Sequence, residues 1–123
     1  MSRIVLGIIA GLVLCAAPAG AQVSPDSDRP VADLYKQTCQ VCHGATGTSP
    51  LEAMNLADGK WKHGTSVEAI SKVIREGVPG TAMMPFKARF SEKEILGLAR
   101  HVRAFDKNLK PEPEPKGKAP AKK

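Results

Sequence analysis

Two cysteines and a histidine lie within five residues of one another, in the run Cys39-Gln40-Val41-Cys42-His43. Thiols at this spacing on one helical turn can each reach one of the two vinyl groups of a porphyrin, and the adjacent imidazole then lies beneath the ring. With the macrocycle fixed at two points, His43 can ligate the iron from the proximal side. The spacing therefore predicts one covalently attached haem c, held by Cys39 and Cys42.

Other uses of the cysteine pair compete with haem attachment. A thioredoxin-like dithiol would open a helix after a strand, and no strand-like alternation precedes Cys39. A zinc site needs four ligands, and because Cys15 lies in a segment predicted to be removed, it would have to recruit His43 with His63 or His101. A plain disulfide is the remaining alternative. Haem attachment is the preferred interpretation of the five-residue run.

The start of the chain has the composition of an export signal. Arg3 provides a short positive region, residues 4–14 are apolar apart from two glycines, and the small-x-small run AGA ends the segment. We therefore expect a signal peptide at residues 1–21, cleaved so that the mature, periplasmic protein begins at Gln22. An uncleaved N-terminal membrane anchor and lipidation of Cys15 are the alternatives.

The remainder of the chain has the length of one small domain. We expect a flexible segment at residues 22–29, one folded domain at residues 30–109 and a disordered Pro/Lys-rich tail at residues 110–123. One Trp, one Tyr and three Phe give few large side chains to fill an interior. A buried planar cofactor would therefore supply apolar surface that the sequence itself lacks.

The positive charge of the chain does not indicate a nucleic-acid partner. The formal net charge is +6, and the tail contributes +3 of it, as five lysines less two glutamates. Elsewhere the basic residues are not interleaved with aromatic side chains, as a nucleic-acid surface would need. We interpret the tail as a solubilising appendage, with peripheral contact to an acidic partner or an anionic membrane surface as the alternative.

Three helices are expected to position the cysteine-histidine run and its loops. Pro30 is placed as the first residue of a helix that delivers both cysteines. A second helix opens with a capping box at residues 65–68 and ends at Gly77, and a third opens with a capping box at residues 91–94 and runs through Phe105. The apolar stripes of all three are interpreted as core, so the fold class is predicted to be all-α.

Two Gly/Pro-rich loops are the places where further function is expected. The first, residues 44–64, lacks helical periodicity and is expected to wrap the haem. The second, residues 77–86, carries Met83 and Met84 between two helices. Because thioether sulfur is a soft donor, this pair is a candidate for the distal iron ligand. For His101, on the third helix, we expect a surface position.

These motifs, in this order, resemble the small monohaem class I c-type cytochromes of the bacterial periplasm, such as cytochrome c6-like carriers. The resemblance covers residues 31–105, from the C-x-x-C-H-G helix through the wrapping loop and the G-T-A-M loop to the C-terminal amphipathic helix. It implies a cytochrome c fold, with three main helices and long loops wrapped around one covalently bound haem. It also implies that the C-terminal helix packs on the N-terminal one, through Leu98, Val102 and Phe105 against Val31, Leu34 and Tyr35.

The same resemblance implies how the iron is held. It implies ligation by His43 and by a methionine, for which alignment on G-T-A-M favours Met83. Met84 is the alternative, because in some relatives the ligand directly precedes a proline, as Met84 precedes Pro85 here. Trp61 is expected to contact a haem propionate, as its counterpart does in related cytochromes.

With both axial positions filled, the iron has no free site for a substrate, so we expect an electron-transfer protein and not an enzyme. It would accept electrons from a dehydrogenase or cytochrome complex and pass them to an oxidase or reductase. The alternative is a haem enzyme or gas sensor with an open distal iron site. Basic residues near the expected haem edge could form a weak docking patch: Lys36, Lys60, Lys62, Lys87 and Arg89.

Overall fold

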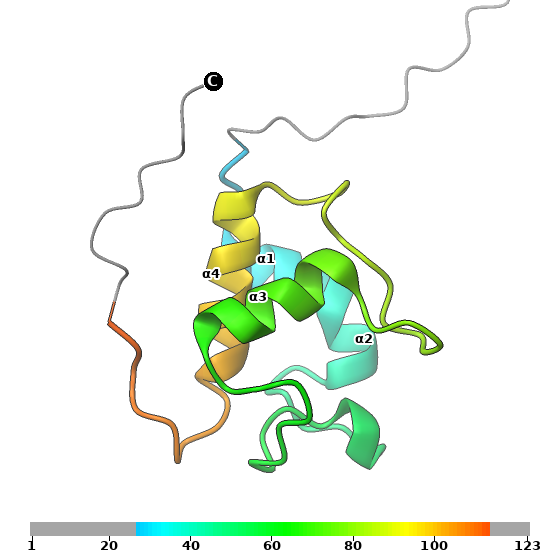
Figure 1. Ribbon diagram of the computed structural model, residues 1–123, viewed down its shortest axis with the longest axis vertical. Helices are drawn as coiled ribbons and strands as arrows, with labels where there is room; N and C mark the ends of the chain where they lie inside the picture. Colours follow the sequence, from blue (N-terminus) through cyan, green and yellow to red (C-terminus); the bar gives the residue numbers. More distant parts are fainter. Residues whose placement is uncertain (1–26, 114–123) are drawn as a thin grey trace, which may run out of the picture.

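The order of the helices follows the expectation from the sequence. The computed structural model describes residues 27–113, and its elements there are helical, without a strand. The predicted signal peptide, the predicted start at Gln22 and the tail from residue 114 onwards lie outside the described residues. In chain order, the elements in Figure 1 are α1 (Val31–Leu34), the π-helical η1 (Tyr35–Cys39), α2 (Gln40–His43), the 3-10 helix η2 (Glu52–Met54), α3 (Val67–Glu76) and α4 (Glu92–Arg103).

The first three elements run end to end, so that residues 31–43 form one helical stretch. Pro30 precedes this stretch with non-helical backbone (φ −55°, ψ 124°), and its carbonyl accepts from the N–H groups of Asp33 and Leu34, each at 3.1 Å. The expectation that Pro30 is the first helical residue is therefore wrong by one position, because its carbonyl opens the helix while its own ψ stays outside. The π-helical turn ends at Cys39.

The N-cap of the middle helix, α3, lies one residue later than the predicted one. The hydroxyl of Ser66, and not that of Thr65, caps the helix by accepting from the N–H of Ala69 at 3.0 Å. Two hydroxyl residues in succession can each serve as an N-cap, so the sequence alone does not separate them. The predicted end is confirmed, because Gly77 follows the helix with φ 69° and its N–H donates to Val73 O.

The predicted capping box of the last helix is confirmed. The Ser91 hydroxyl accepts from Glu94 N at 3.2 Å, and the Glu94 carboxylate accepts from Ser91 N at 2.9 Å. This reciprocal pair satisfies two N–H groups that a helix start leaves without partners. The helix ends at Arg103, so Phe105 lies beyond it and not within it as predicted.

The core forms where α4 crosses the other helices. α4 contacts both α3 and α1, and Figure 1 shows it upright with α3 crossing in front. A Cβ built on Gly97 would lie 2.6 Å from Val31 Cγ2, so the glycine permits the close approach of α1 and α4. The buried core consists of Leu34, Tyr35, Val67, Ile70, Ile74, Phe86, Phe90, Ile95, Leu98, Ala99 and Val102.

The chain after α4 returns along the start of α3. Glu112 Oε2 accepts from the N–H of Val67, the first residue of α3, at 2.9 Å and lies 3.5 Å from Arg103 Nε. The same Arg103 Nε donates to Thr65 O at 2.7 Å. Glu112 therefore satisfies a helix-start donor that the Ser66 hydroxyl does not reach.

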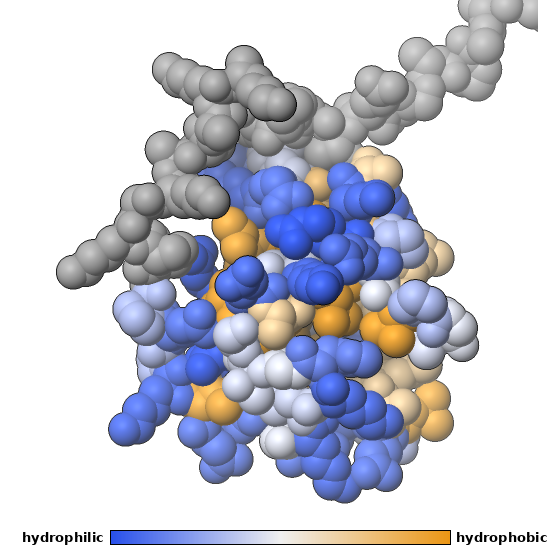
Figure 2. All heavy atoms as spheres, in the orientation of Figure 1, coloured by the Kyte–Doolittle hydropathy of each residue, from blue (hydrophilic) through white to orange (hydrophobic). Residues whose placement is uncertain are grey.

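The face of the molecule shown in Figure 2 is mostly hydrophilic. Figure 2 shows polar and charged side chains over most of one face, with apolar side chains exposed in separate patches between them. Such scattered apolar exposure is ordinary for a protein surface. From residue 27 to residue 113, no helix has the length and apolar character needed to cross a bilayer.

Candidate functional site

The cysteine-histidine run lies at the end of the first helical stretch. Cys39 closes η1 and packs against the core, Cys42 is exposed one turn later, and both carry free thiols. Burial, followed by the neighbouring Cys42, raises the pKa of the Cys39 thiol to about 11. Thiol–disulfide exchange needs a thiolate near neutral pH. Cys39 is therefore a poor attacking thiol near neutral pH.

His43 has one ring nitrogen engaged by the backbone. Its Nδ1 lies 2.7 Å from Met54 O, in η2. A carbonyl only accepts, so Nδ1 carries the proton and Nε2 has a free lone pair. Such a hydrogen bond from the second nitrogen orients a metal-binding imidazole and fixes its tautomer. The half-buried ring is therefore prepared for iron ligation through Nε2, and the residues present fit a haem c.

The chain reverses direction directly after His43. Gly44 has φ 74° and ψ 162°, a backbone conformation available essentially only to glycine, and a Cβ there would lie 2.1 Å from Thr48 O. The buried Tyr35 donates its hydroxyl to Gly44 O at 2.7 Å. Burial also raises the pKa of Tyr35 to about 12, which keeps this hydroxyl protonated. A side chain of the attachment helix, the helical stretch of residues 31–43, thus holds the turn that follows the histidine.

An aromatic cluster lies behind this turn. The ring of Tyr35 contacts those of His101 and Phe105, with centroids 5.0 and 5.2 Å away, and the latter two rings are 5.1 Å apart. His101 is half-buried, and burial lowers its pKa. The expected surface position of His101 is therefore wrong, because the helix turns that residue towards the attachment helix. The predicted meeting of Phe105 with Tyr35 is confirmed.

Trp61 is anchored to the chain after α4. Its Nε1–H donates to Asp106 Oδ2 at 2.8 Å, and this hydrogen bond is the first cause of a lowered Asp106 pKa. An indole has a single N–H donor. The contact between Trp61 and a haem propionate stays a prediction, and in the structure the donor is used by Asp106. Nothing in the sequence near Trp61 indicated this buried partner, which lies 45 residues away.

The methionine pair lies on a loop that is fixed close to the end of α3. Val78 N donates to Met83 O at 2.9 Å, and Met83 N donates to the Thr81 hydroxyl at 3.1 Å. Gly77 has φ 69° and ψ −173°, and a Cβ on it would lie 2.6 Å from Met83 O. The loop backbone is therefore closed on itself. Met83 is half-buried and packs against the core, whereas Met84 is 53% exposed.

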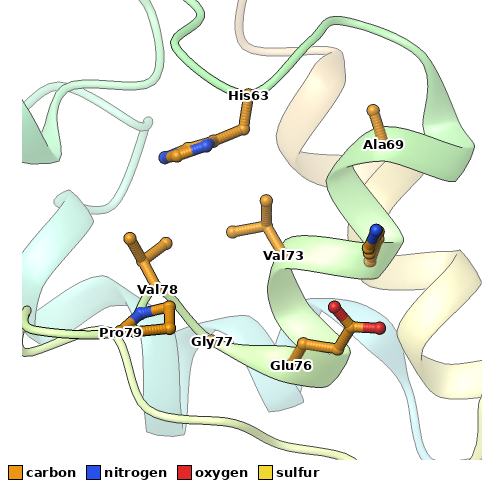
Figure 3. Close-up of a pocket in the computed structure, with 8 residues that line it drawn as sticks. His63, Ala69, Val73, Glu76, Gly77, Val78 and Pro79 are labelled. Carbon is orange, nitrogen blue, oxygen red and sulfur yellow. The ribbon is translucent and has the colours of Figure 1, made fainter.

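A cavity of about 320 Å³ separates the wrapping loop from α3 and the start of the methionine loop. Figure 3 shows His63, from the wrapping loop, facing Val73, Val78 and Pro79 across this space. Much of the lining is apolar, but it also includes the charged side chains of Lys72 and Glu76, and it includes neither the cysteine pair nor His43 nor the methionine pair.

The zinc alternative needs ligands that the fold does not gather. In the part of the chain that the structure describes, no group of three Cys, His, Asp or Glu side chains lies together as a metal site would require. His101, one of the two histidines that a zinc site could recruit, packs instead against Tyr35 and Phe105. The pattern that remains is one imidazole with a free Nε2 beside two thiols.

Comparison with known proteins gives consistent relatives. Cytochrome c55X of Paracoccus denitrificans (strain Pd 1222) is 35% identical over 97 residues, which cover 74% of this chain and 87% of that protein. The cbb3-type cytochrome c oxidase subunit CcoP of Rhodobacter capsulatus is 32% identical over 82 residues, which cover 58% of this chain. This chain spans only 27% of that subunit's length.

Solved structures share the fold. The c-type cytochrome KustC0563 superposes with a TM-score of 0.52 at 38% identity, over 62% of this chain and 96% of that one. A chain of the Kuenenia stuttgartiensis reducing HAO-like protein complex Kustc0457/Kustc0458 superposes with a TM-score of 0.56 over 75% of this chain and 50% of its own. At 23% identity, the second similarity concerns the fold alone. The predicted all-α cytochrome c fold is confirmed.

Residues 26–102 match the family described as cytochrome C oxidase, cbb3-type, subunit III. That match covers more than half of the chain, and the relatives above bear the names of c-type cytochromes or their oxidase subunits. The chain therefore belongs to this family of c-type cytochromes, whose haem c is covalently bound.

Proposed function

We propose that this chain is a monohaem c-type cytochrome that passes single electrons between redox partners in the periplasm or at the membrane. The observation that carries the proposal is the hydrogen bond from His43 Nδ1 to Met54 O, which leaves Nε2 free beside two unpaired thiols. Cys39 and Cys42 would hold the haem by two thioethers, and the haem supplies a one-electron iron couple when bound.

The distal iron ligand is proposed to come from the methionine pair. The sequence favoured Met83, but the contacts of the two side chains favour Met84. Met83 packs against the protein core, while Met84 is 53% exposed. Met83 would then pack beside the haem, where its flexible side chain can fill an irregular space. Replacing each methionine separately with alanine identifies the ligand, because only one replacement removes the sulfur-to-iron absorption band.

With a histidine and a methionine on the iron, the residues of this chain leave no coordination position for a substrate. We therefore propose electron transfer and not catalysis as its activity. Methionine sulfur favours the reduced iron and raises the reduction potential relative to a second histidine. A dehydrogenase or cytochrome complex would serve as the electron donor, and an oxidase or reductase as the acceptor.

The proposed docking patch is weaker than the sequence suggested. Lys60 pairs with Glu52 at 2.6 Å, and the Arg89 guanidinium lies over the Phe86 ring at 5.7 Å. The ion pair cancels the charge of one of the five cations. Lys36, Lys62 and Lys87 are exposed and remain to attract an acidic partner.

We propose a periplasmic location, with the N-terminal segment acting as a cleaved signal peptide or, alternatively, as a membrane anchor. The C-x-x-C-H attachment motif and the composition of residues 1–21 support it. Expression with the periplasmic cytochrome maturation system, followed by fractionation and N-terminal sequencing, separates the two forms. A protein that starts at Gln22 in the periplasmic extract supports cleavage, whereas an intact N-terminus in the membrane fraction supports the anchor.

The test of the function uses the full chain, matured in cells that attach haem c. We expect a mass that corresponds to one covalent haem, and a reduced spectrum that carbon monoxide does not change quickly. The variant His43→Ala should lose the low-spin spectrum, while His63→Ala, a control on the wrapping loop, should keep it. A colourless protein with free thiols would contradict the proposal, and rapid carbon monoxide binding by the unaltered chain would favour the haem enzyme or gas sensor.

A further inference from the structure

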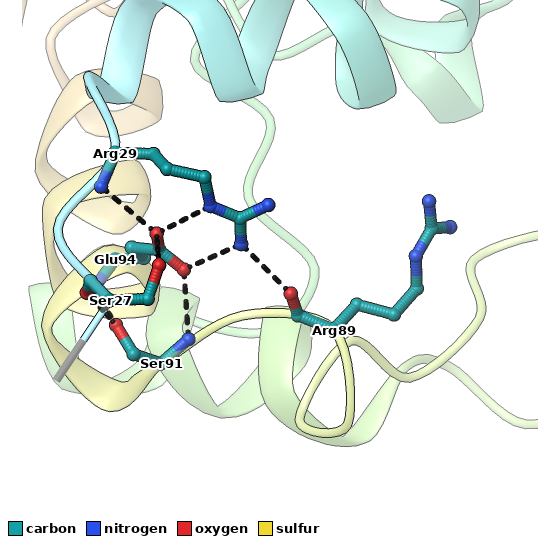
Figure 4. Close-up of polar contacts among 5 residues, drawn as sticks. All are labelled: Ser27, Arg29, Arg89, Ser91 and Glu94. Atoms are coloured by element: carbon teal, nitrogen blue, oxygen red, sulfur yellow. Dashed lines mark hydrogen bonds and ion pairs between the residues drawn. The ribbon is translucent and has the colours of Figure 1, made fainter. Parts of the chain in front are cut away.

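A buried carboxylate lies at the start of α4. Glu94 is 1% exposed, and its two oxygens accept five hydrogen bonds. Oε1 accepts from Ser27 Oγ at 2.8 Å, Arg29 N at 3.1 Å and Arg29 Nε at 2.8 Å, while Oε2 accepts from Arg29 Nη2 and Ser91 N, each at 2.9 Å. We call Ser27, Arg29, Ser91 and Glu94 the Glu94 network (Figure 4).

The Glu94 network does more than complete a helix cap. The capping box itself needs only Ser91 and Glu94. Ser27 and Arg29 come from the segment before α1, about 65 residues away in sequence, and Ser91 Oγ donates back to Ser27 O at 2.6 Å. A buried charge is costly unless every lone pair is satisfied. The carboxylate therefore holds the segment before the attachment helix in one place.

Arg29 carries this restraint to the residues that follow the methionine loop. The same Nη2 that binds Glu94 donates to Arg89 O at 3.0 Å, and the guanidinium carbon lies 5.6 Å from the centre of the Phe90 ring. Arg29 thus contacts two consecutive residues that precede the Ser91 cap. Figure 4 shows its guanidinium between the Glu94 carboxylate and the Arg89 carbonyl.

The residues between the methionines and α4 form a short rigid connection. Phe86 and Phe90 are buried with stacked rings 5.3 Å apart, and Phe90 N donates to Phe86 O at 3.0 Å. Phe86 N in turn donates to Ile74 O, and Lys87 N to Arg75 O, at the end of α3. Met83 and Met84 therefore lie between two attachments: the end of α3 on one side, and Arg29 through the phenylalanine pair on the other.

We propose that Arg29 and Glu94 are positioning residues for the methionine loop, residues 77–86, and so determine how firmly its sulfur stays on the iron. The inference rests on the proposed function, in which Met83 or Met84 is the distal ligand. Neither Arg29 nor Glu94 touches the iron or its ligands in this account. They act by fixing the backbone at Arg89 and Phe90, a few residues after the pair.

Binding of added imidazole to the ferric holoprotein measures this restraint. Imidazole can take the distal position only in molecules whose methionine has left, so its apparent affinity reports the population of that open state. Arg29→Gln removes the two-pronged donation to Glu94. We expect it to raise the apparent imidazole affinity about tenfold, which is the size of effect expected from the loss of one charge-assisted hydrogen bond. Arg29→Lys keeps the charge but not the fork, and an intermediate increase is expected.

Arg75→Gln is the matched control. Arg75 forms the same kind of two-pronged pair with Glu92, at 3.0 and 2.6 Å, and also joins another element to the start of α4. In the described chain its side chain pairs with Glu92 and not with residues 89–91, and the substitution leaves in place its backbone carbonyl, which accepts from Lys87 N. We expect this variant to change the imidazole affinity by less than about twofold. Denaturant unfolding of all variants, followed in parallel, reports global stability separately.

The outcomes separate this inference from the proposed function. Increased imidazole affinity in the Arg29 variants, with the control unchanged, supports the positioning role. Equal effects in the control, or reduced global stability with unchanged imidazole affinity, would show that the network is only structural. If the unaltered protein lacks the sulfur-to-iron band and binds imidazole freely, methionine ligation itself is wrong and the inference falls with it.

Discussion

The two sides of the proposed haem site are held in different ways. His43 lies on a helix, and its ring and the following turn are held by hydrogen bonds with Met54 O, the Tyr35 hydroxyl and Gly47 N, all within eleven residues. The methionine pair lies on a loop whose ends are held by the end of α3 and by Arg29. The histidine side is thus held by residues that are close in sequence, whereas the methionine side depends on contacts between distant parts of the chain.

Both sides nevertheless begin with the same backbone device. Gly44 follows α2 and Gly77 follows α3, with φ near 70° and extended ψ in each case (φ 74°, ψ 162° and φ 69°, ψ −173°). Each glycine lies against backbone that a Cβ would strike. The two sides therefore do not differ in how each loop starts. They differ in the contacts that hold each loop after its first residue. Changes on the two sides should have different signatures.

The largest effect is expected from Gly44→Ala on the histidine side. A Cβ would lie 2.1 Å from Thr48 O in a conformation that alanine rarely adopts, and we expect a loss of about 4 kcal/mol in the free energy of unfolding. Guanidinium unfolding of the holoprotein measures the loss. A loss below about 1 kcal/mol would mean that the turn after His43 is not rigid.

Glu94→Gln should reveal the long-range support on the methionine side through its pH dependence. Hydrogen bonds from Arg29 above all hold the pKa of Glu94 far below its ordinary value. A carboxylate whose pKa is lower in the folded than in the unfolded state stabilises the fold. This contribution is complete at pH values above the unfolded-state pKa of about 4.3, and it is lost as the pH falls from there towards the folded-state pKa. We expect Glu94→Gln to be about 3 kcal/mol less stable at neutral pH and flatter in acid.

The measurement is the unfolding free energy of the oxidised protein from pH 7 down to pH 3. Glu92→Gln serves as the control, because Glu92 also has a lowered pKa, caused first by Arg75, but is exposed. Its effect should be a fraction of that of Glu94→Gln. An acid slope in Glu94→Gln as steep as that of the unaltered protein would contradict the assignment.

Tyr35→Phe should weaken only the histidine side. The change removes the hydrogen bond from the hydroxyl to Gly44 O while keeping the ring against His101 and Phe105. A loss of about 1.5 kcal/mol is expected, because Gly44 O then keeps only the longer hydrogen bond from Gly47 N, at 3.3 Å. The imidazole affinity of the ferric protein should stay unchanged. A rise in that affinity would show that the two sides are coupled more closely than their contacts indicate.

Gly80→Ala should have the smallest effect and makes the comparison with Gly44 sharper. Gly80 has φ 76°, but a Cβ there would meet no heavy atom within 4 Å. Only the backbone preference opposes alanine, so we expect a loss of about 1 kcal/mol. Thermal unfolding of the two alanine variants side by side checks the ratio. Similar losses would mean that backbone conformation, and not the close contact, dominates at both glycines.

The sequence predicted most where the contributing residues are adjacent in the chain. The C-x-x-C-H run, the capping box at Ser91 and Glu94, and the helix end at Gly77 are all local patterns, and the structure has the latter two as predicted. The order of helices and the cytochrome c fold also followed from local periodicity and from the resemblance. Where two local signals competed, as with Thr65 and Ser66, the prediction missed by one position.

What could not be predicted depends on tertiary contacts. The acceptor for His43 is a backbone carbonyl, which no residue type reveals. Asp106 and Trp61 are 45 residues apart, and Arg29 and Glu94 are 65 apart, so each pair required the fold to bring it together. The sequence predicts a flexible segment around Arg29, since a short polar stretch carries no sign of a buried partner downstream.

The π-helical turn over residues 35–39 sets the angle about the helix axis between Tyr35, which packs in the core, and the cysteines proposed to attach the haem. Tyr35 opens it towards the core, and Cys39 closes it beside the attachment site. Shortening the turn by one residue would restore a regular α-helix and rotate the downstream residues by about 100° relative to Tyr35. Helix content would hardly change, yet the thiols would point elsewhere. A one-residue deletion here should therefore uncouple folding of the polypeptide from maturation of its cofactor.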